Sequence, residues 1–209
     1  MKSKTSAAKK TRNLEKSRKE ILGVAFGEIF KHGFQGVSVD DIVKKTSMTK
    51  GAFYHHFPTK LDLGYALVDE VIAPLTVTRW TAPLEEYDNP LEGILKQMRN
   101  NIGKAEPKDL KLGCPLNNLV QEMSPLDEGF RKRLDKALNL WIDETDRHLQ
   151  RAKKNGYLKK DINTRHVAQF VVMAHEGFYG MLKGMQDSKT FEVLYNSLEI
   201  YFDSLQEKK

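Results

Sequence analysis

Residues 37–60, VSVDDIVKKTSMTKGAFYHHFPTK, constrain the fold more than any other stretch of this chain. Ser38 is followed three residues later by Asp41, a pairing typical of a capping box at the start of a helix. The tripeptide Thr46-Ser47-Met48 leaves room only for a turn, and Thr49 then caps a second short helix. A helix, a turn of about three or four residues and a second helix that presents hydrogen-bond donors form the arrangement that enters a DNA major groove.

The net positive charge of the chain is concentrated in its first 19 residues. Eight lysines and arginines stand there against one acid, Glu15, so this segment has a net charge of +7 (8 − 1). The remaining residues sum to −1 (26 − 27), and the formal +6 of the whole chain therefore belongs to this segment. Alone, such a segment is typical of a solvated tail, but beside a helix-turn-helix it indicates contact with phosphates. We expect residues 1–13 to form a flexible basic arm.

The composition fits a protein with a real core and a soluble surface, since 40% of the residues are hydrophobic and 30% are charged. No apolar run approaches the roughly 18 residues of a membrane span, and the charged N-terminus lacks the apolar region of a secretory signal. The single cysteine, Cys114, excludes an intramolecular disulfide and fits a reducing compartment. We therefore expect a cytoplasmic protein with no membrane partner.

Apolar residues recur at helical spacing along nearly the whole chain, and no segment alternates convincingly as a strand does. The expected fold class is therefore all-α. Pro74 is expected to end or kink the helix around it, because proline lacks the N–H donor and clashes with the preceding turn. Further helix starts are predicted at Asn89-Pro90, Pro115, Ser124-Pro125, Asn163 or Thr164, and Asp187-Ser188.

Residues 21–63, ILGVAFGEIFKHGFQGVSVDDIVKKTSMTKGAFYHHFPTKLDL, resemble the N-terminal region of the TetR family of transcriptional regulators. The matching features are a long first helix, the Gly33-Phe34 break, the Ser-capped helix, the pattern Lys-Gly-x-Phe-Tyr-x-His-Phe, and Lys60 at the start of the next helix. The rest of the chain resembles the family in being helical, of suitable length and with two long terminal helices. Gly113-Cys114-Pro115 is similar to a segment in some branches of the family.

The resemblance implies an all-α homodimer with two parts. Residues 14–60 form a three-helix, helix-turn-helix DNA-binding domain, and residues 61–209 form a larger helical domain for ligand binding and dimerisation. Family members are usually repressors that a small molecule releases from a palindromic operator. One position departs from the family pattern, because the turn often has glycine where this chain has Ser47. If the turn needs a positive φ there, serine costs roughly 1 kcal/mol.

Helix-turn-helix geometry places the N-terminal end of the second helix deepest in the groove. There Lys50 is expected to reach guanine O6 or N7, with a phosphate contact as the alternative, and Ala52 to meet a thymine methyl group. Tyr54 is expected at a phosphate, and His56 either at a phosphate or packed beneath the helix. The expected DNA contacts are Ser38, Lys45, Thr49, Lys50, Gly51, Ala52, Tyr54, His55, His56 and Lys60.

A ligand pocket should be apolar with a few polar groups, although a stripe of Met or aromatic residues is also typical of a core. Glu176 is the sharpest indication of a pocket or an interface, since a carboxylate among apolar neighbours needs a partner. The expected pocket residues are Met98, Cys114, Met123, Trp141, His175, Glu176 and Tyr179. Glycines at 177, 180 and 184 are costly inside a helix, which indicates a close helix–helix approach. The expected dimer interface, a four-helix bundle, includes Gly177, Gly180, Leu194, Leu198 and Tyr201.

Three alternatives to a ligand-released repressor stay open. Cys114 precedes a proline at an expected helix start, where the pKa of a thiol can be lowered, so a repressor that senses electrophiles through this thiol is one alternative to a simple buried residue. A non-specific architectural DNA-binding protein is another, although such a protein would not need a C-terminal domain as large as residues 75–209. An enzyme is the third, but the six histidines form no i,i+4 pair, and HExxH, P-loop, GxSxG and GxGxxG motifs are absent. We expect no catalysis, no cofactor and no metal ion.

Overall fold

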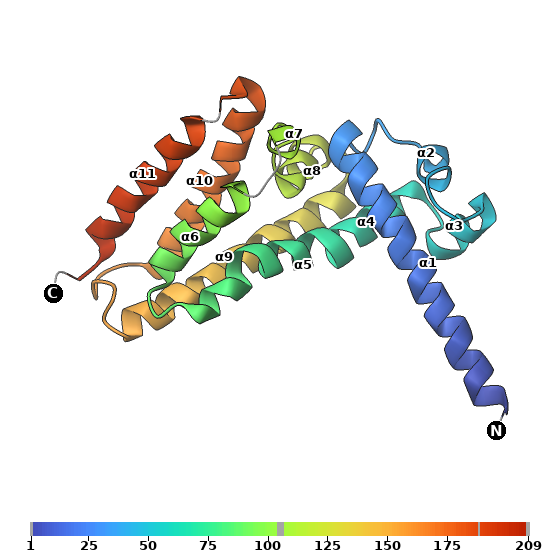
Figure 1. Cartoon of the computed structure of the whole chain (residues 1–209), viewed down its shortest axis with the longest axis horizontal. Helices are drawn as coiled ribbons and strands as arrows, with labels where there is room; N and C mark the ends of the chain where they lie inside the picture. Colours follow the sequence, from blue (N-terminus) through green and yellow to red (C-terminus); the bar gives the residue numbers. More distant parts are fainter. Residues whose placement is uncertain (1, 104–106, 188, 208–209) are drawn as a thin grey trace.

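The computed structural model describes residues 2–103, 107–187 and 189–207, which fold into helices joined by short connections (Figure 1). Within these residues, the only β-type pairing is an isolated antiparallel bridge between Leu158 and Gln206. The all-α prediction is therefore confirmed. None of the described helices combines the length and the hydrophobicity needed to cross a bilayer.

The N-terminal part contains α1 (Lys2–His32), α2 (Val39–Val43) and α3 (Lys50–His56). The expected capping box forms at the start of α2. The hydroxyl of Ser38 accepts the N–H of Asp41 at 3.1 Å, and the carboxylate of Asp41 accepts the N–H of Ser38 at 3.0 Å. The predicted helix-turn-helix is therefore present.

The segment expected as a flexible basic arm, residues 1–13, is helical from Lys2 onward and continues directly into the rest of α1. Residues 2–19 contain neither glycine nor proline, and more than half of them are lysine, arginine, alanine, leucine or glutamate, which favour helices. The expected arm is thus corrected to a helix. α1 ends at Gly33 as predicted, where a φ of 77° lets the N–H bond the Ile29 carbonyl at 2.8 Å.

The next helix passes through Pro74 instead of ending there. It runs as α4 (Lys60–Leu67), η1 (Val68–Ile72), α5 (Ala73–Thr76) and η2 (Val77–Thr81), followed by the 3-10 helix η3 (Ala82–Glu86). η1 and η2 are π-helical, because the N–H of Ala73 bonds the Val68 carbonyl five residues back and Ala82 bonds Val77 in the same way. These wider turns interrupt the i to i−4 pattern in which the proline ring would clash.

The remaining helices are α6 (Pro90–Gly103), α7 (Pro107–Leu110), α8 (Pro115–Met123), α9 (Glu128–Lys154), α10 (Thr164–Met185) and α11 (Lys189–Leu205). Asn89 and Asn163 cap α6 and α10 as predicted. The start predicted at Ser124-Pro125 is wrong, because Ser124 ends α8. The cap of α9 is Asp127, whose carboxylate accepts the N–H of Phe130 at 2.7 Å.

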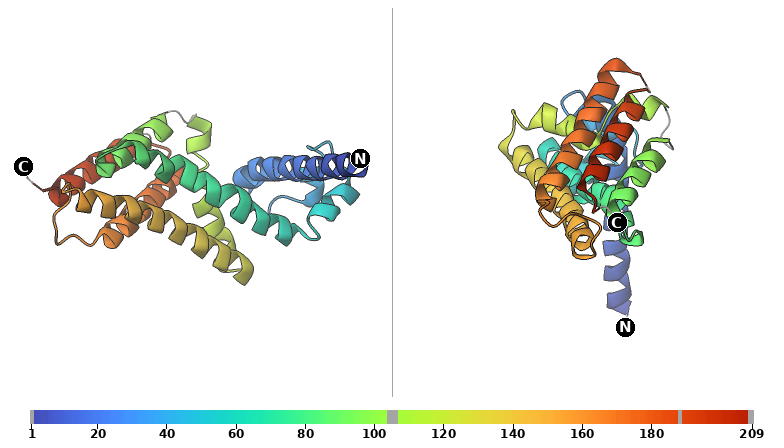
Figure 2. Two further views of the ribbon diagram at one scale, coloured as in Figure 1. Left: turned by 90° about the horizontal axis from the view of Figure 1, so that it is seen from below. Right: turned by 90° about the vertical axis from the view of Figure 1, so that its left-hand side faces the viewer.

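The molecule is elongated, with α1–α3 at one end and α11 towards the other (Figure 1). α9 packs along α4, η1 and η2, and α10 packs against α9 (Figure 2). One cluster of buried side chains is continuous from Ile42 and Phe53 in the N-terminal part to Trp141 and Tyr179 in α9 and α10. The two expected domains therefore share a core, and Lys60 marks only the start of α4.

Gly64 of α4 lies where this shared core is tightest. A Cβ at this position would be 2.6 Å from a ring carbon of Phe34 and would also meet the ring of Phe130. These two rings pack edge to face, with 4.8 Å between their centroids. The absence of a side chain at Gly64 therefore lets the loop after α1 pack directly against α9.

Candidate functional site

α3 presents a polar face to solvent and an apolar face to the core, where Phe53 and Phe57 are buried. The exposed residues at its start and along its outer side are Thr49, Lys50, Gly51, Tyr54 and His55. The hydroxyl of Thr49 accepts the N–H of Ala52 at 3.2 Å, which caps α3 as expected. Ala52 itself is half-buried. The N-terminal end of α3 is thus accessible to a groove of DNA.

Two lysines on this surface are paired with carboxylates. Nζ of Lys50 lies 2.7 Å from Oδ1 of Asp40, and Nζ of Lys45 lies 2.8 Å from Oε2 of Glu28. The hydrogen bond to Asp40 raises the pKa of Lys50. The side chains of Lys50 and Asp40 are 56% and 54% exposed, so a phosphate or a guanine can replace the carboxylate at little cost. Ser38 is exposed beside them at the start of α2.

Two of the expected DNA contacts turn inward. Nε2 of His56 lies 2.8 Å from the hydroxyl of Ser17, and the His56 carbonyl accepts a hydrogen bond from Arg18 at 3.2 Å. The ring is half-buried between α3 and α1, which is the second of its two expected positions, and this burial lowers its pKa. Lys60 is half-buried with Nζ 4.5 Å from the centre of the Phe34 ring. Burial also lowers the pKa of Lys60.

The turn between α2 and α3 is held by Glu20 of α1. Its Oε1 accepts the N–H of Ser47 at 2.7 Å, and its Oε2 accepts the hydroxyl of Ser47 at 3.2 Å. Among the described residues other than glycine, only Gln186 has a positive φ, so the strain expected at Ser47 is absent. Serine at this position instead supplies a hydrogen bond that glycine lacks.

A second link that sequence reasoning missed joins α1 to η1. Arg18 donates to both carboxylate oxygens of Glu70, from Nη2 at 2.5 Å and from Nε at 3.0 Å. Because the same guanidinium also bonds the carbonyl of His56, one side chain connects α1, α3 and η1. The two partners are 52 residues apart, so no local pattern could have revealed the pair.

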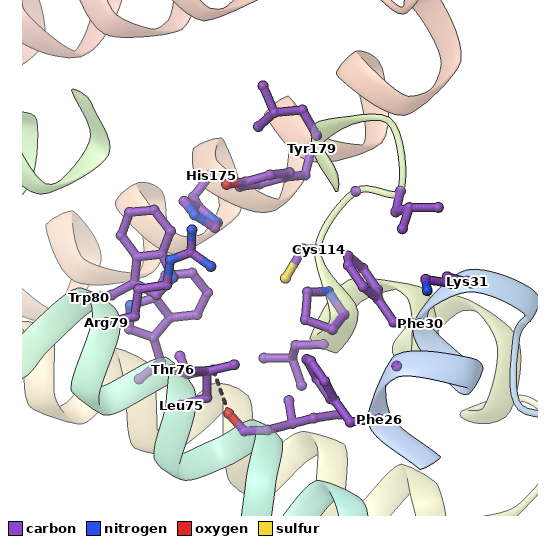
Figure 3. A pocket seen from close by; sticks show the side chains of 18 residues that line it. Phe26, Phe30, Lys31, Leu75, Thr76, Arg79, Trp80, Cys114, His175 and Tyr179 are labelled. Atoms are coloured by element: carbon purple, nitrogen blue, oxygen red, sulfur yellow. Dashed lines mark hydrogen bonds between the residues drawn. The ribbon is translucent and has the colours of Figure 1, made fainter. Parts of the chain in front are cut away.

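A cavity of about 550 Å³ lies between α1 and the helices of the larger part (Figure 3). That volume is within the range of about 300–1,000 Å³ typical of small-molecule sites. Its apolar lining residues include Phe26, Phe30, Ile72, Leu75, Trp80, Leu110, Leu112, Pro115, Leu116 and Trp141. Its polar lining residues are Lys31, Thr76, Arg79, Cys114, His175 and Tyr179. The cavity thus has the composition of a ligand site.

Four of the seven expected pocket residues line this cavity, namely Cys114, Trp141, His175 and Tyr179. Met98 and Met123 are buried in the two core clusters instead. Glu176 lines a separate apolar groove between α8, α9 and α10. Helical periodicity identifies which face of a helix is buried but not what covers it, so the methionines of the core could not be told from those of a pocket.

His175 is the most enclosed polar group of the cavity wall, with 1% of its surface exposed. The rings of Trp80, Trp141 and Tyr179 surround it, at 4.4, 4.7 and 4.8 Å between centroids. Its Nδ1 lies 3.1 Å from Oε1 of Glu176, whereas Nε2 has no hydrogen-bond partner among the described residues. Burial raises the pKa of Tyr179 to about 12, so its hydroxyl is a neutral donor at physiological pH.

Burial also determines the chemistry of Cys114. The residue is 9% exposed, and its sulfur points into the cavity (Figure 3). Burial raises the pKa of the thiol, and the negative charge of Glu176 raises it further. The lowered pKa expected at this helix start is therefore wrong. Because the thiolate is the reactive form, thiol sensing loses the argument that supported it.

α10 and α11 expose an apolar face. Its large members are Phe170, Met173, Met181 and Met185 on α10, and Val193 and Ile200 on α11. Gly177 and Gly180 are exposed on α10, and a Cβ on either would meet nothing within 4 Å. No approach within the described chain therefore explains these glycines. We refer to this surface as the α10–α11 face.

Three other residues expected at the dimer interface are less exposed. Leu198 is 1% exposed inside a core cluster, so it is unavailable to a partner, and that expectation is corrected. Leu194 is half-buried against the same core. Tyr201 is also half-buried and packs on Phe170, with 4.7 Å between ring centroids.

Two parts of the chain match known families. Residues 21–67 match the family described as bacterial regulatory proteins, tetR family, and residues 90–198 match the one described as tetracyclin repressor-like, C-terminal domain. The chain belongs to the TetR family. The first match contains the helix-turn-helix, and the second begins at α6 and extends into α11. This TetR-family chain is therefore a helix-turn-helix transcriptional regulator.

Its relatives cover most of its length. An uncharacterized HTH-type transcriptional regulator in the lacX 3′ region of Lactococcus lactis is 27% identical over 196 residues, 94% of this chain and 98% of that protein. The HTH-type transcriptional repressor DhaR of Mycobacterium sp. is 23% identical over 175 residues, 84% of this chain and 85% of DhaR. A solved TetR-family regulator from Cytophaga hutchinsonii has a TM-score of 0.83 at 20% identity, with 94% of this chain and 98% of that one covered.

Proposed function

We propose that this TetR-family regulator is a homodimeric repressor that binds a palindromic operator through α3 and is released when a small molecule enters the cavity beside α1. The observation that carries the proposal is that α1 belongs to both sites. Phe26 and Phe30 of α1 line the cavity, whereas Glu20 and Arg18 of the same helix hold the turn before α3 and the end of α3. A ligand that displaces α1 therefore displaces the DNA-contacting helix.

The exposed side of α3 supports a contact with the major groove. Lys50 and Ala52 stand at its N-terminal end, where helix-turn-helix proteins read base edges. Tyr54 and His55 follow on the exposed surface, where their side chains are free to contact phosphates. Lys45 adds a positive charge just before the turn.

The α10–α11 face supports pairing with a second copy of the chain. A two-fold axis through this face brings the same surface of both copies together, and the exposed Gly177 and Gly180 allow the two α10 helices to approach closely. The two α3 helices are then related by the same axis. They reach successive major grooves, about 34 Å apart, and both meet the same base edges only on a site with palindromic sequence.

Release follows from a population shift. A ligand between α1 and α10 stabilises dimers in which the separation of the two α3 helices no longer matches the groove spacing. A coupling of about 1–3 kcal/mol is enough, since it changes operator affinity about 5- to 150-fold. The enclosed position of His175 and Tyr179 in the cavity wall supports a ligand that is largely withdrawn from water.

The test is selection of duplexes from a random-sequence pool with the purified protein, followed by titration of the selected site against a scrambled duplex at two salt concentrations. We expect enrichment of a palindrome and a preference that persists at the higher salt, because base contacts do not depend on counterion release. Lys50→Ala should reduce that preference, and Lys136→Ala, an exposed lysine of α9, should retain it. Equal, steeply salt-sensitive binding to both duplexes contradicts specific recognition and favours an architectural role.

A further inference from the structure

Arg79 stands out because its guanidinium lacks a carboxylate partner. The other half-buried arginines that the structure describes are paired: Arg18 at 2.5 Å, Arg133 at 3.0 Å and Arg151 at 2.5 Å from an acidic oxygen. Arg79 forms no ion pair among the described residues, and its hydrogen bond to the Asn101 carbonyl is long, at 3.4 Å. A cation partly withdrawn from water without a counter-charge is costly, so this position favours an anion supplied from outside the chain.

The other donors of the cavity wall lie near Arg79. Arg79, His175 and Tyr179 line the same part of the cavity (Figure 3). The positive charge of Arg79 acts on Tyr179: it lowers the pKa of the phenol, whereas burial raises that pKa. Nε2 of His175 is buried without a partner among the described residues. No aspartate or glutamate is among the residues that line the cavity, whereas Lys31 adds a second cation.

Glu176 does not cancel the charge of Arg79. Its Oε1 lies 3.1 Å from Nδ1 of His175, and the two nitrogens of an imidazole point in different directions. Glu176 therefore engages Nδ1 of His175, and Nε2 is the ring nitrogen left without a partner among the described residues. The charge of Arg79 is left for the ligand.

We propose that the cavity binds an amphipathic organic anion, a monocarboxylate with an aliphatic or arylalkyl tail, whose carboxylate is held by Arg79 together with His175 and Tyr179. A guanidinium binds a planar carboxylate with two parallel hydrogen bonds. The tail lies along the apolar wall, which includes Phe26 and Phe30 of α1. This inference rests on the proposed function, because it names the chemical class of the effector that releases the operator.

The two tryptophans of the chain allow a direct test. Trp80 and Trp141 both line the cavity, and their rings stack with 6.1 Å between centroids. Intrinsic tryptophan fluorescence of the full-length protein therefore arises only from residues of the cavity wall. The probes are 4-phenylbutanoate and octanoate, each titrated against its primary amide, which has nearly the same shape but no charge. We expect each carboxylate to bind at least about tenfold more tightly than its amide, as a charge-assisted pair requires.

Variants assign that preference to the guanidinium. Arg79→Gln should weaken carboxylate binding about tenfold and leave amide binding within about twofold, so that the preference disappears. Arg79→Lys, which keeps the charge but not the planar fork, should keep part of the preference. Arg99→Gln is the matched control, because Arg99 is an exposed arginine of α6 outside the cavity and forms no ion pair among the described residues. It should bind all four probes as the wild type does.

The outcomes separate this inference from the proposed function. Equal binding of carboxylate and amide, failure of both carboxylates to bind, or an unchanged preference in Arg79→Gln overturns the anion site. Release of operator DNA is measured in parallel with the same probes. If the carboxylates bind with the expected preference but do not release DNA, the anion site stands and the proposed effector role fails. If a neutral compound releases DNA and the carboxylates do not bind, the proposed function stands and the anion site fails.

Discussion

The carboxylate of Glu122, at the end of α8, accepts the backbone N–H of Phe34 in the loop that follows α1, at 2.8 Å. Its other oxygen accepts the N–H of Gln35, also at 2.8 Å. α8 begins at Pro115, which lines the cavity together with Cys114. One helix therefore runs from the cavity wall to the backbone of the DNA-binding part, and it forms a second connection beside α1.

The first prediction concerns this connection. Glu122→Ala leaves two backbone N–H groups without their acceptor and should lower the free energy of unfolding by about 1–3 kcal/mol. Glu122→Gln keeps one acceptor oxygen, so its free energy of unfolding should lie between those of Glu122→Ala and the wild type. Urea unfolding measures the difference. Glu86→Ala, an exposed glutamate of η3, is the control and should change stability by less than about 0.5 kcal/mol. A Glu122→Ala variant as stable as the control would contradict the connection.

The second prediction concerns the pair between Lys50 and Asp40, 2.7 Å apart. Asp40→Asn removes a carboxylate that competes with DNA for Lys50 and that repels nearby phosphates. Operator affinity should therefore rise about two- to fivefold, the range expected for loss of an exposed ion pair in the free protein. Fluorescence anisotropy with a labelled operator duplex measures the change. Asp135→Asn on α9 is the control for the change in net charge, and an equal rise in that variant would show a non-specific effect.

The third prediction is a pH dependence. Burial lowers the pKa of His56 from its ordinary value of 6.5, and His55 and Arg18 lower it further. The folded protein therefore resists a proton that the unfolded chain takes up. The stability contributed by neutral His56 is complete above pH 6.5 and is lost as the pH falls from 6.5 towards the lower folded-state pKa.

Thermal unfolding between about pH 7.5 and about pH 5.5 tests this prediction. The melting temperature of the wild type should fall more over this range than that of His56→Gln, whose amide can still donate to Ser17. His55→Gln, at an exposed position, should keep most of the wild-type dependence. If His56→Gln loses as much stability on acidification as the wild type, the buried ring is not the cause.

The fourth prediction concerns the α10–α11 face. Met173→Glu or Met181→Glu places a charge in the centre of the proposed interface and should convert the dimer into a monomer, because an unpaired buried carboxylate costs several kcal/mol. Analytical ultracentrifugation measures the mass. Leu126→Glu, at an exposed position between α8 and α9, should remain dimeric. Dimeric Met173→Glu and Met181→Glu variants would place the interface elsewhere.

Helix boundaries could be predicted because the interactions that cap a helix are local. Ser38 with Asp41, Thr49 with Ala52, and the positive φ at Gly33 all act within four residues of the helix end. The start of α9 differs from the prediction because Ser124-Pro125 carries a capping signal of its own, whereas the true cap, Asp127, is also held by the hydroxyl of Tyr65 at 2.8 Å. That bond joins residues 62 positions apart, and a local pattern cannot report it.

The candidate site was predicted less completely, for a related reason. Cys114, His175 and Tyr179 meet in one cavity, but so does Arg79, which lies in a stretch without clear periodicity and was not expected there. Leu198 follows the same apolar stripe as its neighbours on α11, yet it is buried within the chain. Periodicity shows which face of a helix is apolar, but what covers that face depends on how the helices pack.

The central claim is that occupation of the cavity beside α1 weakens operator binding, and two glycines of α1 allow the most direct test. Gly27 lines the cavity, whereas Gly23, one turn earlier, is exposed outside it, and a Cβ at either position meets nothing within 4 Å. Gly27→Leu therefore fills part of the cavity without any effector, and Gly23→Leu is its matched control. Operator affinity is measured for both folded variants by fluorescence anisotropy. We predict a loss of at least about fivefold for Gly27→Leu and a change within about twofold for Gly23→Leu. Wild-type operator affinity in Gly27→Leu would contradict the claim.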